Sequence, residues 1–116
     1  MFSSNSYAEW TKVGISADKI ITYYVDFESI KEHDGYVYFW YLSDWLKPTE
    51  NVFSITMYAQ VDCKLYRVKI LSTSFHTLPM GKGTTKTKNP SNPEWSYPPP
   101  NSKNNGAVEQ VCDKVK

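Results

Sequence analysis

A succession of strand-like segments joined by very short turns constrains the fold of this chain most strongly. The dipeptide Asp34-Gly35, typical of two-residue hairpin turns, precedes one segment, and two later segments follow each other almost without interruption. Connections this short can join only antiparallel strands. The sequence therefore predicts a single antiparallel sheet of about five to six strands. The candidate strands are residues 10–15, 19–26, 36–45, 52–63 and 64–75.

The two longest candidate strands differ in how their apolar side chains alternate. Residues 52–63 are apolar at every second position, whereas residues 36–45 are apolar or aromatic on both alternating sets. A strand with two apolar faces is usually central and covered on both sides, unless an aromatic face is left open for a partner. Pro48 predicts a turn over residues 47–51, and the next bend is expected at residues 62–64.

The composition changes after the candidate strands. Residues 76–104 are rich in Pro, Gly, Lys and Asn, which predicts a long loop. This loop is expected to be either mobile or pinned to the domain at a few points, with Trp95 and the prolines that follow it as the obvious pin. Nothing marks a second domain. We therefore interpret residues 1–116 as one α+β domain, with a strand region at 10–75, this loop, and a helix at 105–115.

The C-terminal segment predicts a short amphipathic helix that carries one of the two cysteines. A capping residue is available between Ser102 and Asn105. The cysteine count leaves open a disulfide or two unrelated free thiols. Cys63 ends an apolar strand face, so packing the apolar stripe of the helix on that face favours a disulfide from Cys63 to Cys112. The stripe consists of Val108, Val111, Cys112 and Val115.

Composition and charge exclude several classes of protein. The net charge of +1 gives no general attraction to nucleic acid, so no nucleic-acid partner is expected. No apolar run reaches the roughly 18–20 residues of a transmembrane helix, and residues 1–10 lack the pattern of a signal peptide. If the protein is exported, we expect this chain to be its mature part. His33 and His76 are not paired, so no metal site and no cofactor is expected.

Catalytic signatures are missing, and the sequence predicts a protein that is not an enzyme. Asp26 and Glu28 could resemble a carboxylate pair, but solvation at a strand end is the simpler interpretation. Residues 81–88 (GKGTTKTK) lack the spacing of a phosphate-binding loop. His76 has no recognisable acid or nucleophile partner and is expected to be a surface residue.

The best candidate for a partner-binding surface combines basic and aromatic side chains. Basic and aromatic groups together are typical of protein contact sites, although ordinary strand faces carry them too. The candidate residues are Lys64, Arg67 and Lys69 on the second hairpin, with Tyr38 and Trp40 on the preceding strand.

The order of several short motifs resembles the surface-adhesin protein E-like family of bacterial envelope proteins. The motifs are YYVDFESIKEHDGYVYFW, DCKLYRV, WSYPPPNS and AVEQVC, and the resemblance covers about residues 10–112. The resemblance implies an antiparallel sheet with a disulfide-tied C-terminal helix, in an exported protein of a Gram-negative bacterium. It places the protein in the periplasm or at the outer membrane and cell surface, and leaves a lipid anchor in the precursor and a homodimer open. It implies host matrix or envelope proteins as partners.

Two functions follow as hypotheses. The preferred one is a non-enzymatic, adhesin-like module that binds proteins. The alternative is a periplasmic small-ligand carrier or inhibitor-like domain, which would use an aromatic groove between sheet and helix lined by side chains such as Trp40 and Phe53.

Overall fold

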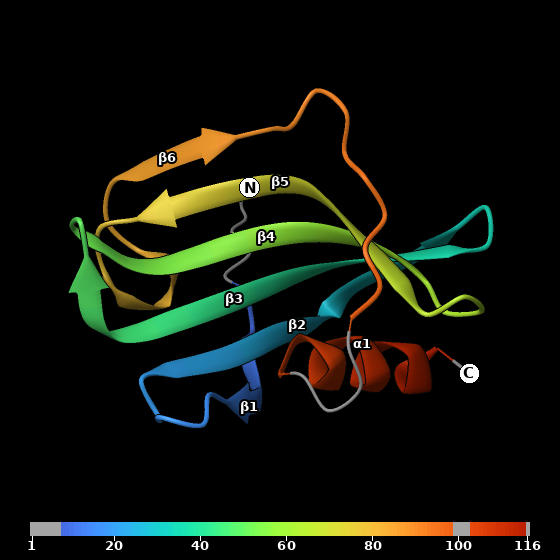
Figure 1. The fold of residues 1–116 in the computed structure, drawn as a ribbon, viewed down its shortest axis with the longest axis horizontal. Helices are drawn as coiled ribbons and strands as arrows, with labels where there is room; N and C mark the ends of the chain where they lie inside the picture. Colours follow the sequence, from blue (N-terminus) through green and yellow to red (C-terminus); the bar gives the residue numbers. More distant parts are fainter. Residues whose placement is uncertain (1–7, 99–102, 116) are drawn as a thin grey trace, which may run out of the picture.

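A single six-stranded antiparallel sheet with one helix on it forms the fold, as predicted (Figure 1). The computed structural model describes residues 8–98 and 103–115, without the side chains of 103–105. The strands follow each other in sheet order β1-β2-β3-β4-β5-β6, so each pairs with its neighbours in sequence. The elements are β1 (Thr11–Ile15), β2 (Ile21–His33), β3 (Tyr36–Thr49), β4 (Val52–Asp62), β5 (Arg67–His76), the 3-10 turn η1 (Pro79–Gly81), β6 (Thr85–Lys88) and α1 (Lys103–Lys114).

The first predicted hairpin turn is confirmed. Asp34 and Gly35 have φ values of 52° and 83°, and they connect β2 to β3. Positive φ at both central residues is the geometry whose twist matches that of the flanking strands. The turn expected over residues 47–51 is shorter, because β3 continues through Pro48 to Thr49. The β3–β4 register is irregular between Asp44 and Thr49, so no ladder hydrogen bond is lost at the proline.

The bend between β4 and β5 lies at residues 63–66 rather than 62–64. Asp62, the last residue of β4, accepts hydrogen bonds from the backbone N–H groups of Lys64 (3.1 Å) and Leu65 (3.2 Å). An Asp side chain that bonds to backbone groups two and three residues ahead stabilises a turn. Asp62 is therefore the last residue of the strand, and its side chain stabilises the bend that follows.

The hydrophobic core lies between the sheet and α1. Phe39 and Val61 from the central strands are 2% and 0% exposed, and Val111 of the helix is 0% exposed. The helix also contacts β1 and β2, and Gln110 Nε2 donates to the carbonyl of Val13 at 3.2 Å. Burial of apolar surface at about 25 cal/mol per Å² holds the helix on this face. We call this side of the sheet the helix side, and the opposite side the open face.

A disulfide joins Cys63, directly after β4, to Cys112 of α1, with the two Cα atoms 5.8 Å apart. This confirms the predicted pairing. The helix begins at Lys103, two residues earlier than expected, and ends at Lys114. The expected capping range of Ser102 to Asn105 starts outside the described residues, and its last members lie within the helix.

The segment predicted as a loop at 76–104 contains a strand, so that prediction is wrong in part. β6 pairs antiparallel with β5, in register from Thr73 with Lys88 to His76 with Thr85. All four β6 residues are exposed and none is apolar, so no hydrophobic alternation marks this strand in the sequence. Later in the segment, Ser96 and Val68 exchange two backbone hydrogen bonds of 2.8 Å, which fix the position of Trp95 as expected.

Candidate interaction surface

The open face of the sheet presents a lateral row of polar and aromatic side chains. Asp26 of β2 is directly opposite Trp40 of β3, which is in turn opposite Tyr58 of β4. Residues directly opposite each other on antiparallel strands project to the same side. Phe39 and Tyr41, on either side of Trp40 in the chain, point to the core, so Trp40 points away from the helix.

A basic and aromatic cluster occupies one end of this region. The Arg67 guanidinium carbon lies 4.3 Å, and the Lys69 ammonium nitrogen 4.5 Å, from the centre of the Trp95 ring. The ring of Tyr36 lies 5.5 Å from that of Trp95. We call these four residues the basic cluster. Cation–π contacts of this kind are each worth about 0.5–1 kcal/mol at exposed sites.

An ion pair with Asp62 fixes the orientation of Arg67. Arg67 Nε donates to Asp62 Oδ2 at 3.1 Å, and the side chains are 21% and 11% exposed. Burial raises the pKa of Asp62, but hydrogen bonds from Leu65, Arg67 and Lys64 outweigh it and hold the pKa below its ordinary value. Burial lowers the pKa of Arg67, and hydrogen bonds to Asp62 and Tyr97 outweigh that effect. Arg67 therefore stays charged in a held geometry.

The other predicted binding residues, Tyr38, Trp40 and Lys64, are not part of the basic cluster. Tyr38 stacks on Tyr58 with ring centres 6.2 Å apart, and Trp40 lies 4.8 Å from the same ring. Trp40 is 37% exposed, so it is accessible on the open face. Lys64 is exposed in the β4–β5 turn, and only the other two predicted basic residues contact Trp95.

The central position of Trp95 in this cluster was not predicted from the sequence. Trp95 was recognised as the residue that pins the loop, but not as a partner of the predicted cations. The only local signal was a large aromatic residue in a polar segment. The bridge between Val68 and Ser96 places its ring over alternate residues of β5. That pairing joins residues 28 positions apart in the chain.

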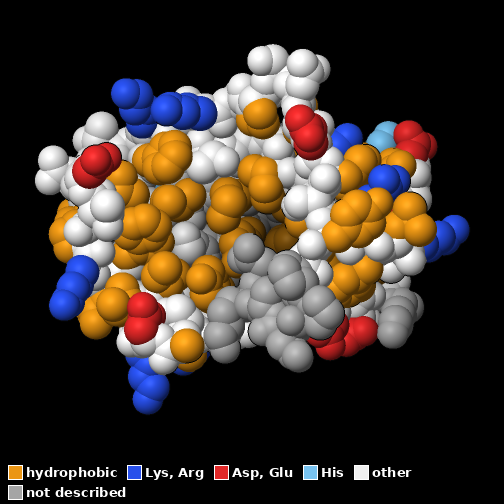
Figure 2. Space-filling model, in the orientation of Figure 1, with side chains coloured by type: hydrophobic (Ala, Val, Ile, Leu, Met, Phe, Trp, Pro, Cys, Tyr) orange, Lys and Arg blue, Asp and Glu red, His pale blue; other side chains and the backbone are white. Residues whose placement is uncertain are grey.

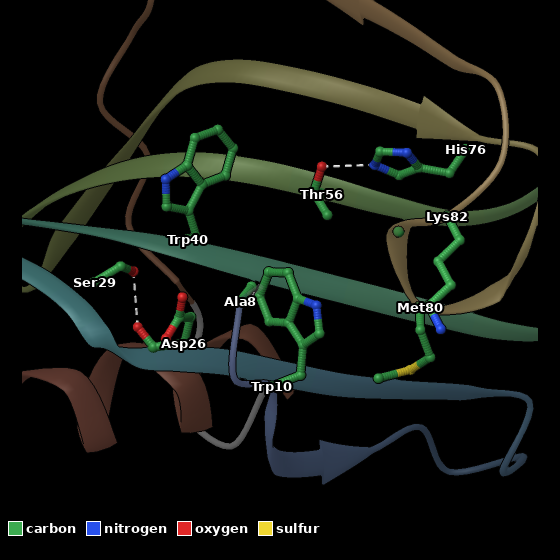
Figure 3. A pocket seen from close by; sticks show the side chains of 10 residues that line it. Ala8, Trp10, Asp26, Ser29, Trp40, Thr56, His76, Met80 and Lys82 are labelled. Carbon is green, nitrogen blue, oxygen red and sulfur yellow. Dashed lines mark hydrogen bonds between the residues drawn. The ribbon is translucent and has the colours of Figure 1, made fainter. Parts of the chain in front are cut away.

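A pocket of about 1050 Å³ lies on the open face (Figure 3). The indoles of Trp10 and Trp40 and the side chains of Asp26 and His76 all line it. Trp10 was part of a predicted strand but was not assigned to any site. The other lining residues are Ala8, Ser29, Thr56, Met80, Gly81 and Lys82.

His76 is buried at the floor of this pocket, so its expected surface position is wrong. It is 6% exposed, and its Nε2 and Nδ1 lie 2.8 Å from Thr56 Oγ1 and 2.9 Å from Thr85 Oγ1. Burial lowers the pKa of His76 below its ordinary value of 6.5. Pairing with β6 buries this ring, and the sequence did not predict β6.

Asp26 is also buried, contrary to the expected solvation at a strand end. It is 7% exposed, whereas Glu28 is exposed. Asp26 Oδ1 accepts the backbone N–H of Glu28 at 3.2 Å, and its carbonyl accepts the Ser29 hydroxyl at 2.9 Å. β2 continues to His33, so Asp26 lies in the middle of the strand. The two carboxylates do not form a pair in one cleft.

The groove expected between sheet and helix is not where the pocket lies. The interface between sheet and α1 is filled by core side chains, and Trp40 projects from the opposite face. Phe53 is half-buried on the helix side by alternation along β4. A smaller hollow of about 380 Å³ lies beside α1 and is lined by Phe27 of β2 and by helix residues, but not by Trp40 or Phe53. The alternative function is therefore not favoured.

A half-exposed apolar area covers the helix side of the sheet beyond α1. Figure 2, in the orientation of Figure 1, shows hydrophobic side chains gathered over the half of the sheet that the helix leaves free. One lateral row across it runs from Tyr23 through Ser43 and Ile55 to Phe75. We call this area the apolar patch. It consists of Tyr23, Trp45, Phe53, Ile55, Met57 and Phe75, all partly exposed.

Within residues 8–98 and 103–115, no group of three or more His, Cys, Asp or Glu side chains could hold a metal ion. In the same residues, no helix has the length and apolar character needed to cross a membrane.

Comparisons with known proteins agree with the fold. A sequence model of the family described as Surface-adhesin protein E matches residues 10–113. The solved structure of Haemophilus influenzae protein E has a TM-score of 0.73 at 16% identity, covering 97% of this chain and 89% of that one. Crystal form II of the same protein gives 0.67 at 20% identity, covering 79% and 80% of the two chains. No curated protein sequence matches this chain.

Proposed function

Because the chain belongs to the Surface-adhesin protein E family, we propose that it is a non-enzymatic, adhesin-like module that binds another protein outside the cytoplasm. The observation that carries this proposal is the basic cluster on the open face, with Arg67 and Lys69 held against Trp95. Tyr38 and Trp40 extend the same surface.

The composition of this surface favours a protein as the partner. Interfaces are enriched in Tyr, Trp and Arg, and these residues contribute most of the binding energy when they are central and well packed. Arg67 is already oriented by Asp62 and Trp95, so little side-chain entropy is lost when it binds. A carboxylate on the partner can accept a charge-assisted hydrogen bond from a terminal nitrogen of this guanidinium, because Nε is the atom that bonds to Asp62.

A catalytic role has no support among the described side chains. The only buried histidine is held between two threonine hydroxyls, and no cysteine thiol is free because Cys63 and Cys112 are joined. A general acid or base must reach the reacting group of a substrate, and both ring nitrogens of His76 already have partners. Binding rather than chemistry is the function that this surface supports.

The family and the disulfide support an extracytoplasmic location and a protein as the partner. Disulfides persist in oxidising compartments, which favours the periplasm or the outer surface of a Gram-negative cell. We propose host matrix proteins or other envelope proteins as partners, with a lipid anchor in the precursor as one means of attachment. A second copy of the chain is a further partner, which the apolar patch supports because contiguous apolar area is rarely left exposed in monomers.

The test is binding of the purified, oxidised domain to immobilised extracellular-matrix and envelope proteins. The variant Arg67→Glu/Lys69→Glu reverses two charges in the basic cluster. Lys86→Glu/Lys88→Glu makes the same change of net charge on β6, away from that cluster, and serves as the control. We expect the first variant to lose at least about tenfold in affinity, as loss of hot-spot contacts predicts, and the control to bind as wild type.

Equal binding by wild type and Arg67→Glu/Lys69→Glu would remove the basic cluster from the proposed function. Equal losses in both double variants would also count against it, because they would show a general charge effect rather than a local contact. Repeating the measurement at higher salt separates the two, since long-range attraction is screened beyond about 8–10 Å.

A further inference from the structure

We propose that the pocket on the open face is a receptor for a cationic side chain, a lysine of the bound protein, with Asp26 as the counter-ion. This inference rests on the proposed protein-binding function and adds a second contact point to the same face. Figure 3 shows the side chains of Asp26, Trp10 and Trp40 lining one pocket.

The proposed counter-ion is the carboxylate of Asp26, a buried residue. Only 7% of the surface of Asp26 is exposed to solvent. Oδ1 accepts one hydrogen bond, from the backbone N–H of Glu28 at 3.2 Å. Within residues 8–98 and 103–115, no donor contacts Oδ2. Because Asp26 lines the pocket, a cationic ligand there can donate to Oδ2 without displacing a donor from the described part of the chain.

Aromatic side chains line the pocket together with this carboxylate. Trp40 is the direct cross-strand neighbour of Asp26 and is 37% exposed, and Trp10 lines the same pocket. Trp is the aromatic side chain that attracts cations most strongly, and cages of aromatic groups with a carboxylate recognise ammonium groups. An apolar stem with a terminal ammonium matches both features, and a lysine side chain has this shape.

Charged side chains are distributed unevenly around the pocket. Lys82, the one cationic side chain that lines it, lies beside Met80 and well apart from Asp26 in Figure 3. His76 is neutral at physiological pH, since burial lowers its pKa. The end of the pocket at Asp26 and Trp40 is therefore negative, while the basic cluster farther along the same face is positive. A partner segment that carries both a carboxylate and a lysine would complement the two regions.

The experiment measures binding of a small lysine derivative, which presents the side chain without the rest of a partner protein. The probe is Nα-acetyl-lysine methylamide, and its neutral counterpart is the same molecule acetylated at Nζ. Binding is followed by NMR through the indole N–H signals of Trp10 and Trp40, which Trp→Phe variants assign. We expect the charged probe to shift these signals and to bind at least about tenfold more tightly than the neutral one, as a charge-assisted hydrogen bond predicts.

Asp26→Asn tests the carboxylate directly and keeps an oxygen for the Glu28 N–H. We expect it to bind the charged probe at least about tenfold more weakly. Glu28→Gln makes the same change of charge on an exposed neighbour in β2, and we expect it to bind as wild type. Thermal unfolding of each variant confirms that it is folded.

Three results would overturn the inference. These are the absence of signal shifts at saturating probe concentration, equal binding of charged and neutral probes, and unchanged binding by Asp26→Asn. If the domain captures a protein through the basic cluster while the lysine probe fails, only this inference is refuted. If the probe binds but no protein is captured through Arg67 and Lys69, the pocket stands and the proposed function fails.

Discussion

Removal of the disulfide is the sharpest test of how this fold is held together. Cys63 and Cys112 are 49 residues apart in the chain, and their bond ties the helix to the end of β4. By the chain-entropy model, a cross-link that closes a loop of this length stabilises the folded state by about 4 kcal/mol. Small domains have a total free energy of unfolding of about 5–15 kcal/mol, so the disulfide supplies a large share.

The loss should be concentrated in the helix. An isolated helix of 12 residues is marginal in water, so α1 depends on its contacts with the sheet. Without the disulfide, only the packing of Ala107, Val108 and Val111 on the core holds the helix, and the last turn also loses its covalent anchor. We therefore expect Cys112→Ala to leave the sheet folded and to increase hydrogen exchange over residues 107–115.

Two measurements check this prediction. Urea unfolding of the oxidised wild type and of Cys112→Ala should give midpoints about 2 M apart, if the dependence on urea is about 2 kcal/mol/M. Hydrogen exchange read by mass spectrometry then places the loss in the chain. The control is Val111→Ala with the disulfide intact, which removes buried helix contacts but keeps the anchor.

The result that would refute the reasoning is specific. If Cys112→Ala kept wild-type exchange protection over residues 107–115, packing alone would hold the helix. If instead exchange rose equally in the strands, the domain would unfold as one unit, and the helix would not be a separately tethered element. Both outcomes would contradict a role for the bond in anchoring α1.

Two other consequences concern His76 and the apolar patch. Burial lowers the pKa of folded His76 below 6.5, so its contribution to stability is present above pH 6.5 and is lost as the pH falls through the folded-state pKa. Thermal unfolding between pH 7 and 5 should show this loss of stability, and the loss should be smaller in His76→Gln. For the apolar patch, we expect the wild type to self-associate in sedimentation experiments. Ile55→Lys should weaken this self-association, whereas Leu46→Lys, a change of an exposed residue outside the patch, should not. A wild type that stays monomeric at high concentration would contradict a dimer.

Most of the sheet could be predicted from the sequence, because its signals are local. Alternation of apolar residues marks β4, and Asp34-Gly35 marks the β2–β3 turn, since both depend only on backbone geometry and neighbouring side chains. The pairing of Cys63 with Cys112 could also be predicted, because each cysteine belongs to an apolar surface, one on a strand and one on a helix. These two surfaces pack together because packing removes their apolar area from water.

The composition of the open face was decided by the tertiary structure. Trp95 lies between Arg67 and Lys69 because a backbone bridge brings residue 96 to residue 68, and His76 is buried because the polar strand β6 pairs with β5. Neither pairing has a hydrophobic period, so neither leaves a local pattern to read. The local sequence around Asp26 does not distinguish it from an exposed carboxylate within a strand. Its burial comes from neighbours on β3 and around the pocket. Local patterns determine which elements form, whereas long-range backbone pairing determines which side chains meet on the face that binds.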